Sequence, residues 1–208
     1  MTVMDSPREA ELALVARLRA GDADAFDRVY DQFHARLFGF LARLARNRDT
    51  AEDLLEETWL RFVDHAPKLK PDTTLGPLLY TIARNLHVSY CRSRLIENSY
   101  NTELLGLWPS GSGSVSPFDA TVAAETGSRI DIALAAMPAI YREALLLVVV
   151  EDMKPAEAAV ICGVSAEAMR QRLSRARAMI AGALEKHDAR VDLDLLPARG
   201  WARKRVTT

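Results

Sequence analysis

Apolar residues recur every three or four positions along most of this chain, and this spacing restricts it to a helical fold. The clearest stretch is Asp24–Leu44, whose apolar positions form a single stripe: Phe26, Val29, Tyr30, Phe33, Leu37, Leu41 and Leu44. Shorter stripes in residues 12–18, 54–62 and 78–86 predict three further helices, with Gly21 and Pro67 marking two of their ends. Because no stretch has the alternation of a half-buried strand, we predict an all-α protein.

A change in composition divides the chain into two parts. Residues 98–128 contain six Ser, four Gly and two Pro, and neither Lys nor Arg. This composition is typical of a flexible linker. We therefore predict two small helical domains, residues 9–97 and 129–186, joined by the linker 98–128 and followed by a tail, 187–208. The second domain is predicted to be a helix-turn-helix.

The bulk composition excludes several classes of protein. The longest apolar run, Ala144–Val150, has seven residues, whereas a membrane span needs about 20. The first residues lack the basic-then-apolar order of a secretory signal, and two cysteines, Cys91 and Cys162, do not suggest a disulfide framework. We therefore expect a cytoplasmic protein. Its net charge is −1, so any binding of nucleic acid must depend on local positive charge.

The second domain has the order of signals found in a helix-turn-helix. A short helix, Ala156–Cys162, is predicted to begin after Pro155 and to end at Gly163, and Ser165 can cap a longer helix from Ala166 to about Lys186. Residues 165–186 hold five basic and two acidic side chains. A solvated amphipathic helix could carry the same charges. The placement of the glycine and the serine cap is what favours DNA binding.

The arginine-rich helix has a packing face and a reading face. Met169, Leu173, Ala176 and Ile180 are spaced four, three and four apart, so they should pack inward. Arginine and glutamine suit base edges and phosphates in a major groove. The candidate DNA-binding residues are Arg170, Gln171, Ser174 and Arg175, with Arg172 and Arg177 adding positive charge.

Residues 163–177 resemble the recognition helix of extracytoplasmic-function (ECF) sigma factors, which are promoter-specificity subunits of bacterial RNA polymerase. Residues 133–147 resemble the start of the second DNA-binding domain of that family, and residues 18–26, 51–59 and 79–85 resemble segments of its first domain. The segments occur in the family's order. The resemblance implies that the second domain reads the upstream (minus-35) promoter element. It also implies that residues 51–59 dock on the clamp helices of core RNA polymerase and that residues 79–85 open the downstream (minus-10) element.

The residue types in the first domain fit these roles. Residues 47–65 carry six acidic side chains, and an acidic face can attract a basic protein partner. Residues 78–95 carry three arginines and no acid, which suits contact with unstacked bases and a DNA backbone. Either set could instead be a solvated face. The candidate polymerase-binding residues are Glu52, Asp53, Glu56 and Glu57, and the candidate downstream DNA contacts are Arg84, Asn85, Ser89 and Arg92.

Some positions depart from the family pattern. Glu56 stands where the family usually has glutamine, Ser89 where it has aspartate, and residues 76–78 where it has Arg-x-Trp. These changes bear on downstream specificity and opening more than on the fold, because Leu78 keeps the apolar pattern. His87 and Cys91 are one helical turn apart, as two metal ligands can be, but no further ligand pair is nearby. We predict no metal and no cofactor.

The sequence therefore predicts a sigma factor that is not itself an enzyme. Its expected partners are core RNA polymerase, promoter DNA and, by resemblance, an anti-sigma protein. One alternative is a sigma-like decoy that binds an anti-sigma protein and never engages a promoter. Another is a stand-alone helix-turn-helix regulator, which would bind duplex DNA without polymerase.

Overall fold

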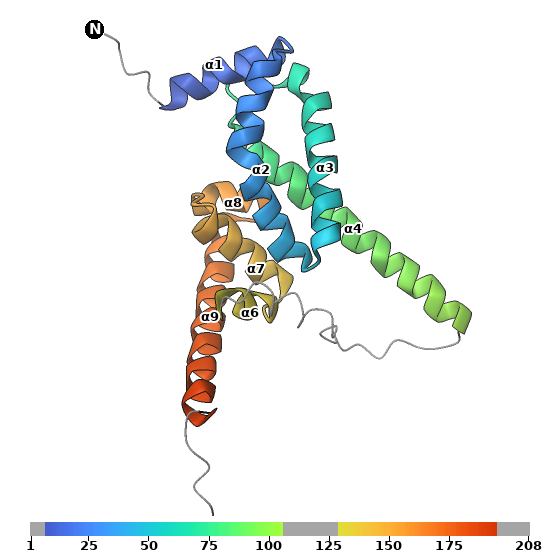
Figure 1. The fold of residues 1–208 in the computed structure, drawn as a ribbon, viewed down its shortest axis with the longest axis vertical. Coiled ribbons are helices and arrows are strands. Elements are labelled where there is room, and N and C mark those ends of the chain that lie inside the picture. Colours follow the sequence, from blue (N-terminus) through green and yellow to red (C-terminus); the bar gives the residue numbers. More distant parts are fainter. Residues whose placement is uncertain (1–6, 106–128, 195–208) are drawn as a thin grey trace, which may run out of the picture.

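The computed structural model describes residues 7–105 and 129–194, with side chains for residues 7–96 and 130–183, and every regular element in these ranges is helical (Figure 1). The all-α prediction is confirmed. The elements of the first half are α1 (Pro7–Arg19), α2 (Ala23–Ala45), α3 (Arg48–His65), the 3-10 turn η1 (Ala66–Lys68) and α4 (Leu75–Leu105). Those of the second half are α6 (Arg129–Ala135), α7 (Ala139–Leu145), the π-helical turn η2 (Leu146–Val150), α8 (Pro155–Cys162) and α9 (Ala166–Asp194).

The helix ends lie where local residues can satisfy the backbone. Gly21 follows α1 with φ of 77°, which suits a residue without a side chain. Asp22 Oδ1 then accepts a hydrogen bond from Ala25 N at 3.3 Å and caps α2. Asn47 Oδ1 accepts one from Thr50 N at 2.7 Å and caps α3. These caps fix the sharp turns that fold α1, α2 and α3 against one another.

Two helices continue beyond their predicted ends. α4 runs to Leu105, into the start of the stretch predicted as linker, and α9 runs to Asp194, into the predicted tail. Residues 106–128 and 195–208, which hold the rest of both predictions, lie outside the described residues. These two ends were placed too early because the sequence has no glycine or proline there to indicate where either helix stops.

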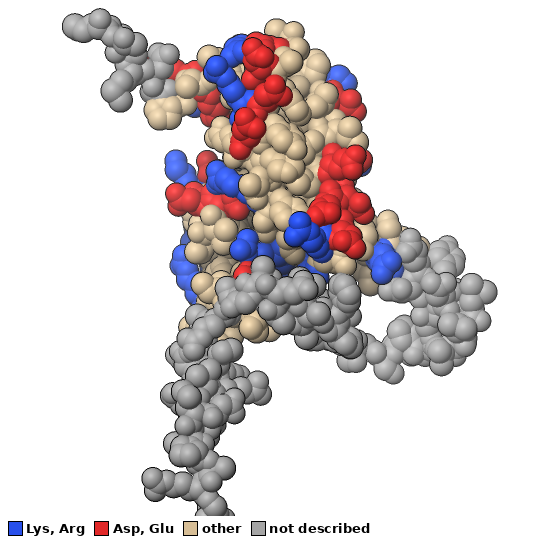
Figure 2. All heavy atoms as spheres, viewed as in Figure 1, with Lys and Arg blue, Asp and Glu red and all other residues tan. Residues whose placement is uncertain are grey.

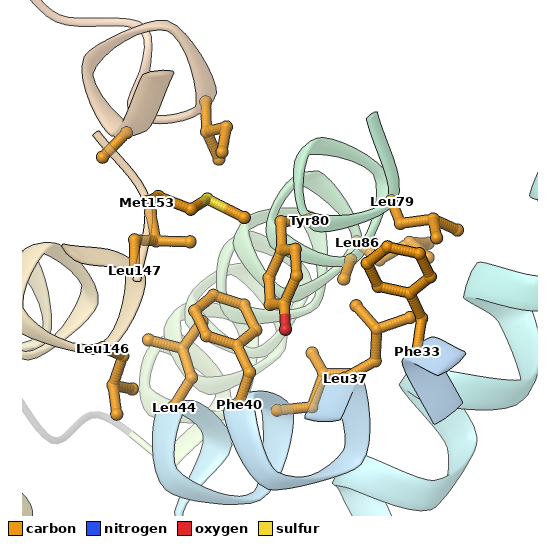
Figure 3. Packing of buried hydrophobic residues seen from close by; sticks show 14 of the residues in the cluster. Phe33, Leu37, Phe40, Leu44, Leu79, Tyr80, Leu86, Leu146, Leu147 and Met153 are labelled. Atoms are coloured by element: carbon orange, nitrogen blue, oxygen red, sulfur yellow. The ribbon is translucent and has the colours of Figure 1, made fainter. Parts of the chain in front are cut away.

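The first domain is built on α2, α3 and α4, each of which packs against the other two. Leu37, Phe62 and Leu79 are fully buried, and so is Tyr80, which the apolar stripe of α4 did not include. The Tyr80 ring packs edge-on against Phe40 with their centroids 5.2 Å apart (Figure 3). The buried face of α4 is therefore rotated slightly from the predicted one. Of the five apolar positions in the predicted stripe, Leu79, Ala83 and Leu86 are buried, whereas Leu78 and Ile82 are only partly buried.

The second domain has a strongly apolar segment at its centre. Residues 144–147 are buried, at 5% exposure or less, but Val149 and Val150 at the end of η2 are 56% and 48% exposed. The apolar run Ala144–Val150 is therefore buried in its first half and exposed where η2 ends. The chain turns out of the core there, and Asp152 follows in a left-handed conformation with φ of 54°.

The two domains share one hydrophobic core. Phe40, Leu44 and Tyr80 of the first domain lie beside Leu146, Leu147 and Met153 of the second (Figure 3). α8 also packs on α4, and α6 and α7 pack on α2. The second domain is therefore seated against the helix that carries the candidate downstream DNA contacts.

Candidate nucleic-acid and partner interfaces

The turn before α9 is formed by the two signals seen in the sequence. Gly163 ends α8 with φ of 64°, and Ser165 Oγ accepts a hydrogen bond from Ala168 N at 3.1 Å. At the start of α8, the Glu157 carboxylate accepts a hydrogen bond from Lys154 N at 3.0 Å. The predicted boundaries of both helices at this turn are confirmed. The turn fixes the angle at which α9 leaves α8.

α9 has the two faces expected from its spacing. Met169, Leu173 and Ala176 are at most 3% exposed and pack against the rest of the domain. The reading face is solvent-exposed and consists of Arg170, Gln171, Ser174 and Arg175; Arg177 is also exposed, whereas Arg172 is partly buried.

Two of the arginines on the reading face are held by neighbouring side chains. Arg170 forms an ion pair with Glu167 one turn earlier, and this bond holds the pKa of the Glu167 carboxyl below its usual range. Arg175 donates a hydrogen bond to Tyr141 Oη of α7 at 3.3 Å. The sequence did not single out Tyr141, because its role depends on α7 crossing α9. The hydroxyl restricts where the Arg175 guanidinium can lie.

The four downstream candidates on α4 have two different environments. Asn85, Ser89 and Arg92 are exposed. Arg84 is directed at the second domain, where its Nε donates to Glu143 Oε1 of α7 at 2.9 Å, and its side chain is only 21% exposed. The structure therefore leaves three of the predicted contacts open to solvent and pairs the fourth with a buried carboxylate.

The four candidate acids lie on the outer side of α3, and Figure 2 shows acidic side chains gathered over this helix. Glu52 pairs with Arg48 and Glu57 with Arg61, each at 2.8 Å along the helix. Asp53 and Glu56 are exposed. Surface pairs of this kind contribute little to stability, so these charges remain available to a partner.

An apolar groove runs beside the acidic residues, between α2 and α3, and encloses about 620 Å³. Leu60 and Val63 lie on it with 57% and 48% of their surface exposed. The ring of Tyr30 lies tilted against those of His34 and Trp59, with the ring centroids 4.4 Å and 4.9 Å away. The groove was not predicted, although three of its aromatic residues had been placed in apolar stripes. Its lining is Phe26, Tyr30, His34, Phe38, Arg48, Glu52, Leu55, Glu56, Trp59, Leu60, Val63 and Asp64.

Buried polar groups connect the two domains. Glu151, 6% exposed, accepts hydrogen bonds from Tyr80 Oη and, at 3.1 Å, from Arg36 Nε. Burial, and then the Glu151 carboxylate, raise the pKa of Tyr80 far above its usual value, so its hydroxyl stays protonated and donates. Arg142, 4% exposed, donates to the carbonyl oxygens of Arg43 and Leu44, each at 3.1 Å.

Burial favours the neutral forms of His87 and Cys162, two groups near Arg84. Burial, with the charges of Arg142 and Arg84, lowers the pKa of His87 to about 4. Burial raises the pKa of the Cys162 thiol to about 12. Cys91 Sγ lies 3.6 Å from His87 Nε2, but in the described part of the chain no three His, Cys, Asp or Glu side chains are grouped to hold a metal ion. None of the described helices is both long and apolar enough to cross a bilayer.

Comparison with known protein families gives two matches. Residues 29–95 match the family model of sigma-70 region 2, and residues 128–180 match that of sigma-70 region 4. The first range contains α3 and most of α2, together with the part of α4 that bears the downstream candidates. The second contains the helix-turn-helix.

Similar proteins cover most of the chain. The RNA polymerase sigma factor CarQ of Myxococcus xanthus is 31% identical over 159 residues, 76% of this chain and 88% of that protein. The ECF RNA polymerase sigma factor EcfG of Rhodopseudomonas palustris is 29% identical, with 88% of each chain covered. Among solved structures, the sigma factor RpoE of Bartonella quintana, in complex with the anti-sigma factor NepR, has a TM-score of 0.61 and 25% identity. That likeness covers 77% of this chain and 96% of the other.

Proposed function

This chain belongs to the ECF sigma factors, subunits that bind core RNA polymerase and direct initiation at their own promoters, and we propose which of its surfaces carry these tasks. The reading face of α9 contacts the upstream promoter element. The exposed side of α4 contacts the downstream element, and α3 with its groove binds the polymerase. The exposure of four polar residues on one face of a capped α9 carries this assignment most directly.

The proposed upstream contact depends on the arginine that is positioned best. Arg175 is exposed, and the Tyr141 hydroxyl limits the orientations of its guanidinium. A positioned guanidinium can bind a guanine edge with two hydrogen bonds, so less rotamer entropy is lost when the contact forms. Arg170 is also exposed, but it must give up or share its ion pair with Glu167 when it meets DNA.

Replacing Arg175 with alanine should weaken binding to the upstream element by about 1–3 kcal/mol if the side chain reads a base. Replacing Tyr141 with phenylalanine should weaken it less. The Tyr141→Phe effect should disappear in the Arg175→Ala background, because the hydroxyl acts through the guanidinium. The measurement is the affinity of the full-length holoenzyme for promoter duplexes that differ at single upstream base pairs.

Arg19→Ala serves as the control, because it removes an exposed arginine at the end of α1, outside the proposed DNA and polymerase contacts. Unchanged affinity of Arg175→Ala would remove Arg175 from the reading face. Additive losses in the Tyr141 and Arg175 double variant would show that Tyr141 acts independently of the guanidinium.

The polymerase-binding surface is proposed to combine charge with apolar contact. Glu52, Asp53 and Glu56 form the acidic part, while Leu60 and Val63 expose apolar surface in the adjacent groove. Exposed apolar patches rimmed by charge are typical of protein interfaces. A partner helix that carries basic side chains next to an apolar side chain would complement this surface.

Replacing Asp53 and Glu57 with lysine should weaken the binding of core polymerase at least tenfold, because two attractive charges become repulsive. Binding of upstream duplex by the variant should be unaffected. Asp24→Lys with Asp31→Lys is a matched control, since it makes the same charge change on the exposed side of α2. Titration of labelled core enzyme measures the effect, and normal holoenzyme formation by the α3 variant would disprove the docking assignment.

Run-off transcription with purified core RNA polymerase tests the proposal as a whole. Transcripts from specific start sites should appear only when the full chain is added. An anti-sigma partner is also proposed, because the similar RpoE of Bartonella quintana was solved with one. Tight binding of an anti-sigma protein without any promoter-specific transcript would favour the decoy, and duplex binding without polymerase binding would favour a stand-alone regulator.

A further inference from the structure

One acidic side chain lies on the same side of α9 as the reading face. Residues 166–184 hold four arginines and a single acid, Glu167, in the first turn of the helix. Because Glu167 comes three residues before Arg170 and four before Gln171, the three side chains are neighbours on the helix surface. The Glu167 side chain is 62% exposed, so it does not serve the packing of the domain. An exposed carboxylate repels the phosphates of DNA and opposes binding that depends on charge alone.

Glu167 holds one edge of the Arg170 guanidinium. Its Oε2 accepts a hydrogen bond from Arg170 Nε at 3.1 Å and another from Arg170 Nη2. A guanidinium has five N–H donors in a fixed plane, and these two bonds use the pair along its side. The N–H groups at the end of the side chain, on Nη1 and on the outer side of Nη2, take no part in this ion pair.

The end of the Arg170 guanidinium is the edge that suits a guanine base. Guanine presents two acceptors, O6 and N7, side by side in the major groove, and two parallel N–H groups of an arginine bind both of them. Arg170 can make this contact while its side edge stays bonded to Glu167. A phosphate is different, because it competes with Glu167 for the same guanidinium and is repelled by the charge of the carboxylate. The ion pair is therefore compatible with base contact and opposes phosphate contact.

We propose that Glu167 is a specificity-determining residue for the upstream promoter element, which positions the Arg170 guanidinium for a guanine and opposes its use as a phosphate contact. This inference rests on the proposed function, in which α9 reads that element. Glu167 acts through Arg170 and is a positioning residue. Hydrogen bonds from Arg170 and then Gln171 hold the pKa of the Glu167 carboxyl below its usual range, so the carboxylate stays charged at neutral pH.

Replacing Glu167 with glutamine removes the charge and keeps the size of the side chain. The affinity of the holoenzyme is measured for a duplex with a promoter that it transcribes in the run-off assay, and for duplexes changed at single upstream base pairs. Arg170→Ala identifies the base pair that Arg170 reads, because the preference for guanine should be lost there. At that base pair Glu167→Gln should lower the preference for guanine by about threefold, the size expected for an exposed ion pair. Preferences at the other upstream base pairs should not change.

Binding to a duplex with a scrambled upstream element should change in the opposite direction. Once the ion pair is gone, Arg170 can neutralise a phosphate, so Glu167→Gln should bind this duplex more tightly than the wild type does. Each added phosphate contact steepens the dependence of log affinity on log salt concentration by about one. Glu9→Gln is a matched control, because it also replaces an exposed glutamate in the first turn of a helix, but on α1. It should change neither base preference nor salt dependence.

The double variant of Glu167→Gln with Arg170→Ala shows whether Glu167 acts through the arginine, since its base preferences should then equal those of Arg170→Ala alone. An unchanged preference for guanine in Glu167→Gln would overturn the inference. An equal loss of affinity for every duplex would also overturn it, because that is the effect of a weakened helix. A wild-type holoenzyme that distinguishes no upstream base pair would instead contradict the proposed function of α9.

Discussion

Replacing Arg142 with alanine should lower the free energy of unfolding by about 3–5 kcal/mol, because three carbonyl oxygens lose a charged donor and each buried polar group left without a partner costs about 1–3 kcal/mol. Its guanidinium donates to the carbonyls of Arg43 and Leu44 at 3.1 Å each, and to that of Met137 at 2.8 Å. Arg43 and Leu44 belong to the last turn of α2, whose carbonyls have no partner within the helix. A buried cation from α7 therefore closes the end of α2, where the helix dipole also favours positive charge.

Urea denaturation of the full chain measures this loss. Arg43→Ala is a matched control, because it also removes an arginine at this junction, but one whose side chain is 40% exposed. The Arg43–Asp131 pair is a surface pair, for which about 1 kcal/mol or less is expected. Arg142→Lys should recover part of the lost stability, because lysine keeps the positive charge. It should not recover all of it, because the compact ammonium group lacks the planar set of donors with which the guanidinium bonds three carbonyl oxygens. Equal losses for Arg142→Ala and Arg43→Ala would contradict the role of Arg142 at the end of α2.

The helices and most of their ends could be predicted because the signals for them are local, whereas the C-terminal ends of α4 and α9 carry no such signal and were placed too early. Gly163 and Ser165 mark the turn before α9, and the four-three spacing of Met169, Leu173 and Ala176 predicts its buried face. Each of these effects acts within one or two turns of the chain. The family resemblance then added the order of the segments and the expected roles of α3 and α4.

The partners of the polar residues could not be predicted, because they come from the other domain. Arg84 on α4 was expected to be a DNA contact and is paired with Glu143. Glu151 follows an apolar run and could have been a surface residue, yet it is buried against Tyr80 and Arg36. Periodicity tells which side of a helix turns inward, but it does not identify the distant group that meets that side.

The groove between α2 and α3 could not be predicted, because its apolar residues follow the same spacing as core residues. Phe26 and Tyr30 belong to the apolar stripe of α2, but they line an open groove, and Tyr30 is 36% exposed. The apolar face of a helix can be covered by the rest of the same chain or by a bound partner. The sequence alone does not distinguish these two cases.

The stability of the chain should fall as the pH drops from about 6.5 to about 4, and His87 should account for about 3 kcal/mol of that loss. The pKa of His87 is lowered to about 4 by burial and then by the charges of Arg142 and Arg84, while in the unfolded chain it has its ordinary value near 6.5. Between these two values the unfolded chain binds more protons than the folded one. The stabilising contribution is therefore complete above pH 6.5 and is lost as the pH falls toward 4.

His87→Leu isolates this contribution, because carboxylates elsewhere also titrate at low pH and only the difference between the two chains reports on His87. The free energy of unfolding is measured by urea denaturation for both chains between pH 4 and pH 7.5. The wild type should lose more stability than the variant across this range, and parallel curves would contradict the prediction. His87 is 8% exposed and lies near Arg84 of its own helix, Arg142 of α7 and Cys91. Protonation would thus place a third positive charge beside Arg84 and Arg142 at the contact between the domains.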